Sequence, residues 1–214
     1  MPRIYKLKKR AERLDETRRR IVEATVHLHE TRGAASTSIS AIAELAGVER
    51  LTVYRHFPDD RSLLKACTSH YLHLNPPPDP NSWCEVGDAG ERLRLGLSQI
   101  YDYHRRTEPM FARAARDLEE NPILREVLGH FFAQWEQIRE ILVSPWEVSG
   151  SSMTLLRALI GHAMSFQTWR SLVREQGLDD AQIVELMVQV VKCMVLKESQ
   201  ESTLRQRSNG ETCC

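Results

Sequence analysis

The chain has 214 residues, of which 42% are hydrophobic and 27% charged, so it can form one or two domains with a substantial core and is not a low-complexity sequence. It has no run of 18 apolar residues and no apolar stretch after its basic N-terminus, so we expect a cytoplasmic protein with neither a membrane span nor a signal peptide. The cysteines are odd in number and scattered, which is typical of reduced thiols: Cys67, Cys84, Cys193, Cys213 and Cys214.

The formal net charge is zero, but the charge is unevenly distributed along the chain. Residues 1–65 hold 4 Lys and 10 Arg against 9 acidic residues, a net of +5, and the remainder therefore carries −5. The run from Arg3 to Arg20 is especially basic. This asymmetry predicts a part that faces DNA, with residues 1–14 as a flexible basic arm, and a second part with a different role.

Hydrophobic spacing predicts helices almost throughout the chain, with no alternating strand pattern. The first four helices are expected over about residues 15–32, 40–46, 50–56 and 60–74. Residues 75–81 then contain prolines in a density that neither a helix nor a strand accommodates. This segment indicates the end of the small basic part.

Amphipathic helices are also expected in the second part, over about residues 91–106, from Asn121 through Leu142, over 153–175 and over 181–197. Asn121 has a side chain that can cap a helix, and Pro122 suits the first turn. Residues 198–214 are polar and aperiodic, which predicts a disordered tail.

The residues from Ser38 to Phe57 have the pattern of a helix-turn-helix. Two short helices that cross closely need a small residue on the first helix, which Ala43 supplies, and a turn residue that tolerates positive φ, which Gly47 supplies. The apolar anchors of the pair are Ile39, Ile42, Val48, Val53 and Phe57. The remaining residues of the second helix are polar or basic and can reach phosphates and base edges in a major groove.

This stretch resembles the N-terminal domain of the TetR family of bacterial regulators. The matching residues are Thr37, Ile42, Ala43, Ala46, Gly47, Val48, Thr52, Tyr54, His56 and Phe57. The segment 21–24 and Gly33 also fit the family's first helix. The resemblance implies an all-α fold with a three-helix DNA-binding domain over residues 15–62 and a larger helical ligand-binding and dimerisation domain over residues 63–197.

The resemblance also implies individual DNA contacts. Tyr54 and His56 would bind phosphates, and Arg50 would read a base, with a bidentate contact to guanine as the best fit to its guanidinium. Thr37 or Ser38 would bind a phosphate at the N-terminus of the second helix. The complete expected DNA-binding set is Thr37, Ser38, Ser40, Arg50, Leu51, Thr52, Tyr54, Arg55, His56 and Arg61.

Two positions depart from the family pattern. Glu49 stands where the family usually has a serine that caps the recognition helix, and it places a negative charge near the DNA. Asp60 stands where the family often has a phosphate-binding lysine, and Arg61 is the expected substitute for that lysine.

The family's second domain dimerises through its last two helices and binds a small molecule, and we expect both properties here. The large residues on the middle helices are Tyr101, Tyr103, Met110, Phe111, Phe132, Trp135, Phe166 and Trp169. As a group they predict an apolar, aromatic ligand pocket, whereas ordinary core packing is the alternative for each one alone.

We therefore expect a sequence-specific transcriptional regulator: a repressor that binds a palindromic double-stranded DNA operator as a homodimer and is released by a small apolar or aromatic effector. The alternatives are a DNA-binding regulator without a small-molecule ligand and an activator. The sequence has no Gly-rich phosphate loop, G-x-S-x-G elbow or H-E-x-x-H motif, so we expect neither an enzyme nor a cofactor. Cys67 and His70 lie three residues apart without a further ligand near them in sequence, so we expect no metal site.

Overall fold

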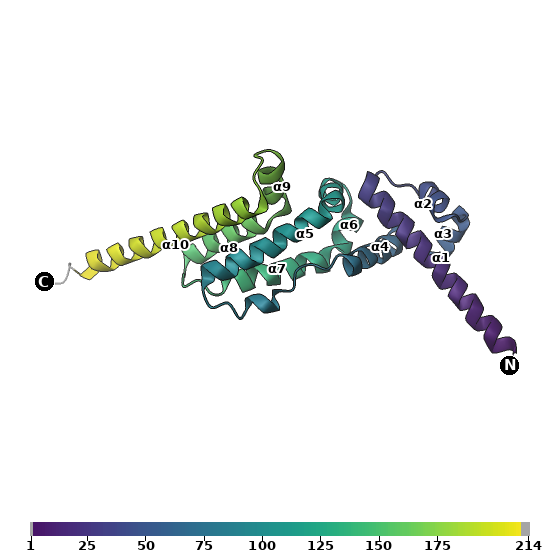
Figure 1. Ribbon diagram of the computed structural model, residues 1–214, viewed down its shortest axis with the longest axis horizontal. Helices are drawn as coiled ribbons and strands as arrows, with labels where there is room; N and C mark the ends of the chain where they lie inside the picture. Colours follow the sequence, from purple (N-terminus) through teal and green to yellow (C-terminus); the bar gives the residue numbers. More distant parts are fainter. Residues whose placement is uncertain (1, 211–214) are drawn as a thin grey trace. The chain divides into compact units, whose positions relative to one another are not determined.

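The computed structural model describes the backbone of residues 2–210 and the side chains of residues 8–197, and every regular element in that part of the chain is a helix (Figure 1). The prediction of an all-α fold is therefore confirmed. Two compact units are present, and each is built from two separate segments of the chain. The first comprises the residues up to Pro76 together with Thr107–Phe131, and the second comprises Pro77–Arg106 and the residues after Phe131.

The first unit surrounds the helix-turn-helix. Its elements are α1 (Pro2–Arg32), α2 (Ile39–Ala46), α3 (Arg50–His56), α4 (Asp60–Leu74), the last part of α5 (Ala89–Asp117) and α6 (Pro122–Val127). Ile21 and Val53 are fully buried in its core. The resemblance implied a DNA-binding domain that ends at residue 62, whereas the proline-rich segment indicated the end of this part at residues 75–81. In the structure Leu63, Leu64 and Leu124 pack into the same core, so α4 and α6 lie with the helix-turn-helix.

The second unit has its own core. Its elements are η1 (Pro80–Trp83), the first part of α5, most of α7 (Gly129–Val143), α8 (Ser151–Met164), α9 (Phe166–Arg174) and α10 (Asp180–Gly210). The largest fully buried side chains are Trp83, Tyr101, Tyr103 and Trp169. Trp83 lies just after the proline-rich segment, and its indole N–H donates to Gln99 Oε1 at 3.0 Å. The proline-rich segment therefore leads directly into the second core.

The helix expected over residues 153–175 is broken at Ser165, which has extended backbone at ψ 133°. Two side chains from α5 bond to the carbonyl groups just before the break. The Tyr101 hydroxyl donates to the Ala163 carbonyl oxygen at 2.8 Å, and His104 Nε2 lies 2.9 Å from the Met164 carbonyl oxygen. These contacts satisfy carbonyls that have no intrahelical partner at a helix C-terminus, so the packing of α5 helps to end α8.

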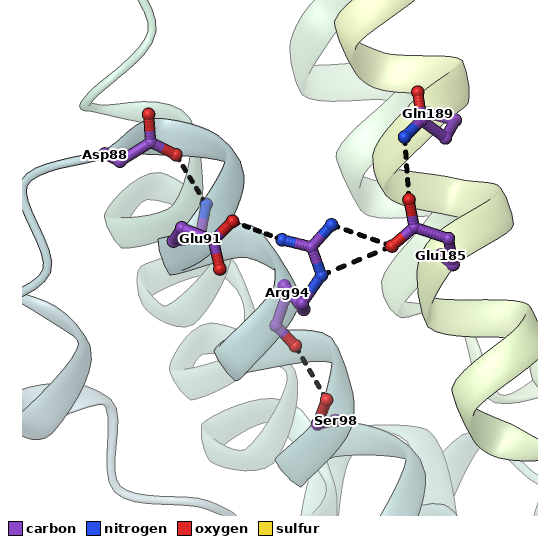
Figure 2. A network of polar contacts seen from close by, with 6 residues as sticks. All are labelled: Asp88, Glu91, Arg94, Ser98, Glu185 and Gln189. Atoms are coloured by element: carbon purple, nitrogen blue, oxygen red, sulfur yellow. Dashed lines mark hydrogen bonds and ion pairs between the residues drawn. The ribbon is translucent and has the colours of Figure 1, made fainter.

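The exposed side of the second unit carries a polar network between α5 and α10 (Figure 2). Arg94 on α5 donates to Glu91 on the same helix and to Glu185 on α10, the latter at 2.7 Å. Gln189 donates to the other oxygen of Glu185 at 2.7 Å, so one carboxylate is held by two side chains. The network joins two helices that lie 91 residues apart in sequence, counted from Arg94 to Glu185.

Three further predictions of secondary structure differ from the structure. The helix expected from Asn121 through Leu142 is divided into α6 and α7, because Leu124 packs into the first core and Leu142 into the second. Residues 2–14, expected as a flexible arm, continue α1, since they contain good helix formers and Pro2 stands at the first helical position. The tail expected after residue 197 continues α10 to Gly210. Cys213 and Cys214 lie outside the described residues.

Candidate DNA-binding interface

The turn between α2 and α3 has the geometry that the sequence predicts. Gly47 has φ 64° and ψ 42°, in the left-handed region, and its N–H bonds to carbonyl oxygens of α2. Ala43 is 3% exposed, in the core where α2 meets its neighbours. Val53 and Phe57 bury the inner side of α3 and its C-terminal cap. These contacts hold α3 with its other side turned to solvent.

The outer face of α3 carries the predicted reading residues. Arg50 and Arg55 are exposed, Leu51 is 70% exposed and Tyr54 43% exposed. Thr52 and His56 are half-buried beside them. Positions separated by four residues lie on one side of a helix, so Arg50 and Tyr54 form one row and Leu51 and Arg55 the next. The face combines guanidinium, hydroxyl and apolar groups, which suit both phosphates and base edges.

The N-terminus of α2 is built by Thr37 and Ser38. Ser38 caps the helix by accepting a 3.2 Å hydrogen bond from the Ala41 N–H through its Oγ, which leaves its own hydroxyl proton available to another acceptor. The Thr37 hydroxyl donates to the Gly33 carbonyl oxygen at 2.7 Å, so its proton is already used. Ser38 and the exposed Ser40 are therefore better phosphate donors than Thr37.

Glu49 occupies the cap position of α3, as expected, and makes no side-chain cap bond there. Arg61, expected to bind a phosphate, forms an ion pair with Glu126 on α6. Asp59 caps α4 by accepting a hydrogen bond from the Ser62 N–H at 2.7 Å, and this bond is the main cause of the lowered pKa of Asp59. Arg61 is thus engaged by its own unit, because the tertiary packing brings α6 beside the start of α4.

Arg18 on α1 was not among the predicted site residues, yet it lies directly beside the recognition helix. Its Nη1 donates to the His56 carbonyl oxygen at 3.0 Å, and its guanidinium carbon lies 4.2 Å from the centre of the Phe57 ring. Arg18 is itself exposed, but it precedes the buried Ile21 by three residues, and this spacing brings it to the edge of the side of α1 that packs against the unit.

A recess of about 250 Å³ lies between α1 and α3, lined by Leu14, Asp15, Arg18, Arg55 and His56. Partial burial lowers the pKa of His56, and the charges of Arg18 and Arg55 lower it further. Two guanidinium groups and one carboxylate, that of Asp15, therefore line the recess beside the exposed surface of α3, so its cationic groups outnumber its single acidic group.

The predicted ligand-pocket residues separate into two groups. Within the second unit, Tyr103, Trp135, Phe166 and Trp169 surround His104, which the sequence analysis did not single out. The ring centre of His104 lies 6.3 Å from that of Tyr103, 5.6 Å from Trp135, 5.5 Å from Phe166 and 5.8 Å from Trp169. Burial lowers the pKa of His104 to about 4, so the imidazole is neutral at pH 7.

The other predicted pocket residues lie elsewhere or have another role. Tyr101 is fully buried and bonds to Ala163, as described above. Met110 and Phe111 belong to the first unit, where Phe111 packs against Phe131 with 5.5 Å between ring centres. Phe132 is 41% exposed. The presence of large residues in the sequence could not show which of them share a site, because α5 passes from the second unit into the first between Arg106 and Thr107.

No group of three potential metal-binding side chains occurs among the described residues. Cys67 is buried, its Sγ lies 3.7 Å from Nδ1 of His29, and burial raises the pKa of its thiol to about 12. The histidine beside Cys67 is thus His29 on α1.

Two short helices joined by a left-handed glycine turn, with a basic outer face, define a helix-turn-helix protein. A family model described as "Bacterial regulatory proteins, tetR family" matches residues 21–67, which span this element. The chain is 40% identical to the HTH-type transcriptional regulator TtgR of Pseudomonas putida over 93 residues. That match covers 42% of this chain and 44% of TtgR, so it spans less than half of this relative.

Solved structures extend the likeness in fold to most of the chain. FadR from Bacillus subtilis, in complex with stearoyl-CoA, has a TM-score of 0.58 and 16% identity and covers 80% of this chain and 96% of its own. A TetR-like regulator from Rhodococcus has a TM-score of 0.58 and 19% identity, covering 82% of this chain and 93% of its own. Residues 21–67 therefore match the tetR family of bacterial regulatory proteins, the family that the sequence pattern of this stretch resembles.

Proposed function

We propose that this protein is a sequence-specific DNA-binding transcriptional regulator. The observation that carries the proposal is the outer face of α3. Arg50 and Arg55 stand exposed on a helix whose inner side is locked by Val53 and by the turn at Gly47. A helix held in this way can enter a major groove without losing its place in the core.

Each exposed residue has a role that fits its chemistry. Arg50, at the N-terminus of α3, would read a base, since a guanidinium matches the two acceptors of guanine. Tyr54 and His56 would bind phosphates, and Ser38 would donate to a phosphate at the N-terminus of α2. Arg18 and Arg55 add positive charge beside them.

A homodimer would allow two such helices to read a palindrome. The second unit exposes large apolar side chains on α8 and α10, namely Leu155 (53%), Leu186 (42%), Val190 (42%) and Leu196 (63%). Exposed apolar side chains on adjacent helices of this kind favour pairing with a second copy. The two recognition helices of the dimer would be spaced for half-sites ~34–36 Å apart.

The aromatic residues around His104 support a response to a small molecule. We infer that a small apolar or aromatic effector enters this cluster and lowers the affinity for DNA, so that the protein acts as a repressor in the cytoplasm. FadR, which shares the fold, was solved with stearoyl-CoA. The coupling of the two sites would be mutual: DNA would weaken effector binding by the same factor.

Selection of duplexes from a random library by the full-length protein tests the proposal. We expect a palindromic consensus to be enriched. Arg50→Ala should then relax specificity at one base position, by about 1–3 kcal/mol, whereas Tyr54→Phe should weaken binding to all sequences alike. A failure to enrich any sequence would overturn the proposed function, and a uniform loss from Arg50→Ala would overturn its role as the base reader.

A further inference from the structure

The carboxylate of Asp117 is buried, with 2% of its side chain exposed, at the end of α5. Its Oδ2 accepts a 3.0 Å hydrogen bond from the backbone N–H of Ala35, which lies 82 residues earlier in the chain. Its Oδ1 accepts a 3.1 Å hydrogen bond from Nε of Arg116. A buried carboxylate is costly unless its oxygens are paired in this way, so its presence at this point calls for a specific reason.

The two residues together hold the loop between α1 and α2. Arg116 Nη2 donates to the carbonyl oxygen of Arg32, the last residue of α1, at 3.2 Å. Gly33 lies between these contacts with φ 93°, and a Cβ at this position would stand 2.7 Å from Asp117 Oδ2. The positive φ disfavours any other residue at this position, and Arg116 and Asp117 would crowd an added Cβ.

The held loop leads directly into the first turn of α2. Within it, the Thr37 hydroxyl donates to the Gly33 carbonyl oxygen at 2.7 Å, and the Thr37 N–H bonds to the Ala34 carbonyl oxygen at 3.2 Å. Ser38 follows at once as the cap of α2. The segment from Gly33 to Ser38 is thus held by hydrogen bonds, one of them to Asp117, up to the N-terminal end of α2 that we propose to meet a DNA phosphate.

We propose that Asp117 is a positioning residue for DNA binding, which fixes the loop from Gly33 to Thr37 and so presents the first turn of α2 to a backbone phosphate. This inference rests on the proposed DNA-binding function. Without the carboxylate, the loop and the cap would sample other arrangements, and apparent affinity falls in proportion to the fraction of molecules that are competent to bind. Asp117 itself does not touch the DNA.

The test uses the full-length protein, a duplex obtained by the selection described above, and copies of that duplex with one phosphate at a time replaced by a neutral methylphosphonate. We expect Asp117→Ala to weaken binding about tenfold, the scale of one charged hydrogen bond. Methylphosphonate at the phosphate bound by α2 should weaken DNA binding by the wild type. It should not weaken DNA binding by Asp117→Ala any further, because that variant has already lost the contact between α2 and this phosphate. Effects at other phosphates should be unchanged.

Two controls separate positioning from a loss of folding. Glu119→Ala removes a carboxylate from an exposed position two residues further on and should bind as the wild type does. Asp117→Asn keeps an oxygen that can accept from the Ala35 N–H, so we expect it to retain the sensitivity at the α2 phosphate. This variant keeps the inference testable if Asp117→Ala does not fold.

The inference is overturned if Asp117→Ala binds as tightly as the wild type. It is also overturned if the methylphosphonate effect adds fully to that of the substitution, or if Asp117→Asn loses the sensitivity at that phosphate. Binding of a selected duplex by the wild type in these cases would leave the proposed DNA-binding function intact. Absence of any selected duplex would overturn both.

Discussion

The guanidinium of Arg18 lies 4.2 Å from the centre of the Phe57 ring and donates a 3.0 Å hydrogen bond to the His56 carbonyl oxygen. The contact joins the middle of α1 to the C-terminal end of α3. A cation is favourable there for two reasons, since the aromatic face attracts it and the last carbonyl groups of a helix carry partial negative charge.

Removal of this contact should loosen the recognition helix. We expect Arg18→Ala to lower the free energy of unfolding by about 1–2 kcal/mol, from the lost stacking and charged hydrogen bond. Denaturant titration measures the change. Arg10→Ala is the control for stability, because it removes the same charge from an exposed position of α1. Equal losses from the two substitutions would show that the contact with Phe57 contributes nothing.

Gly33 should tolerate no side chain. Alanine at φ 93° is strained, and its Cβ would lie 2.7 Å from the buried Asp117 carboxylate. We expect Gly33→Ala to lower the free energy of unfolding by about 2–3 kcal/mol, from backbone strain and crowding together. Gly87→Ala, where no atom lies within 4 Å of the added Cβ, should cost much less in the same thermal or denaturant measurement. A similar cost at both positions would contradict this account.

His104 should make stability fall at acid pH. In the unfolded chain it takes up a proton as the pH falls through about 6.5, whereas burial lowers its pKa in the folded protein to about 4, despite the nearby Asp180 and the Met164 carbonyl oxygen, which raise it. Its stabilising contribution is therefore complete above pH 6.5 and is lost as the pH falls towards 4, at about 1.4 kcal/mol per pH unit.

Denaturant titrations between pH 7 and 4.5 measure this dependence. His104→Gln should reduce the number of protons taken up on unfolding near pH 5 by about one. His29, whose pKa burial also lowers to about 4, should behave alike, so His29→Gln removes a second proton and the two effects should add. An unchanged slope in His104→Gln would contradict the buried, neutral imidazole.

A charge on the outer face of α10 should separate the proposed dimer. Val190→Glu places a carboxylate in the exposed apolar set of α8 and α10, where a second copy would have to bury it. We expect a shift from dimer to monomer in sedimentation, with an unchanged helical spectrum. Ala181→Glu adds the same charge to the exposed first turn of α10 and should leave the dimer intact. A dimer that persists in Val190→Glu would place the interface elsewhere.

Much of the helix-turn-helix was readable from the sequence, because local interactions decide it. The Ser38 cap, the left-handed Gly47 and the buried Ala43 each depend on the residue type and on partners within a few positions. Glu49 is also decided locally: it stands in place of a capping serine, and its side chain makes no cap hydrogen bond to α3. The match of residues 21–67 to the family model reflects this dense local pattern.

Contacts between distant residues were decided only by the tertiary structure. Arg61 is held by Glu126, 65 residues away, and Asp117 reaches Ala35 across 82 residues. Periodicity likewise predicted one helix over residues 153–175 and could not show that side chains of α5 meet the carbonyl groups where α8 ends. Residue type and spacing thus predicted the all-α class, the two short helices of the helix-turn-helix and the exposed side of α3, since these depend on neighbours along the chain. They did not predict where the longer helices begin, end or break. The contacts that hold this side of α3 in place form where separate helices pack against one another. The spacing of residues along the chain does not show which helices will pack together.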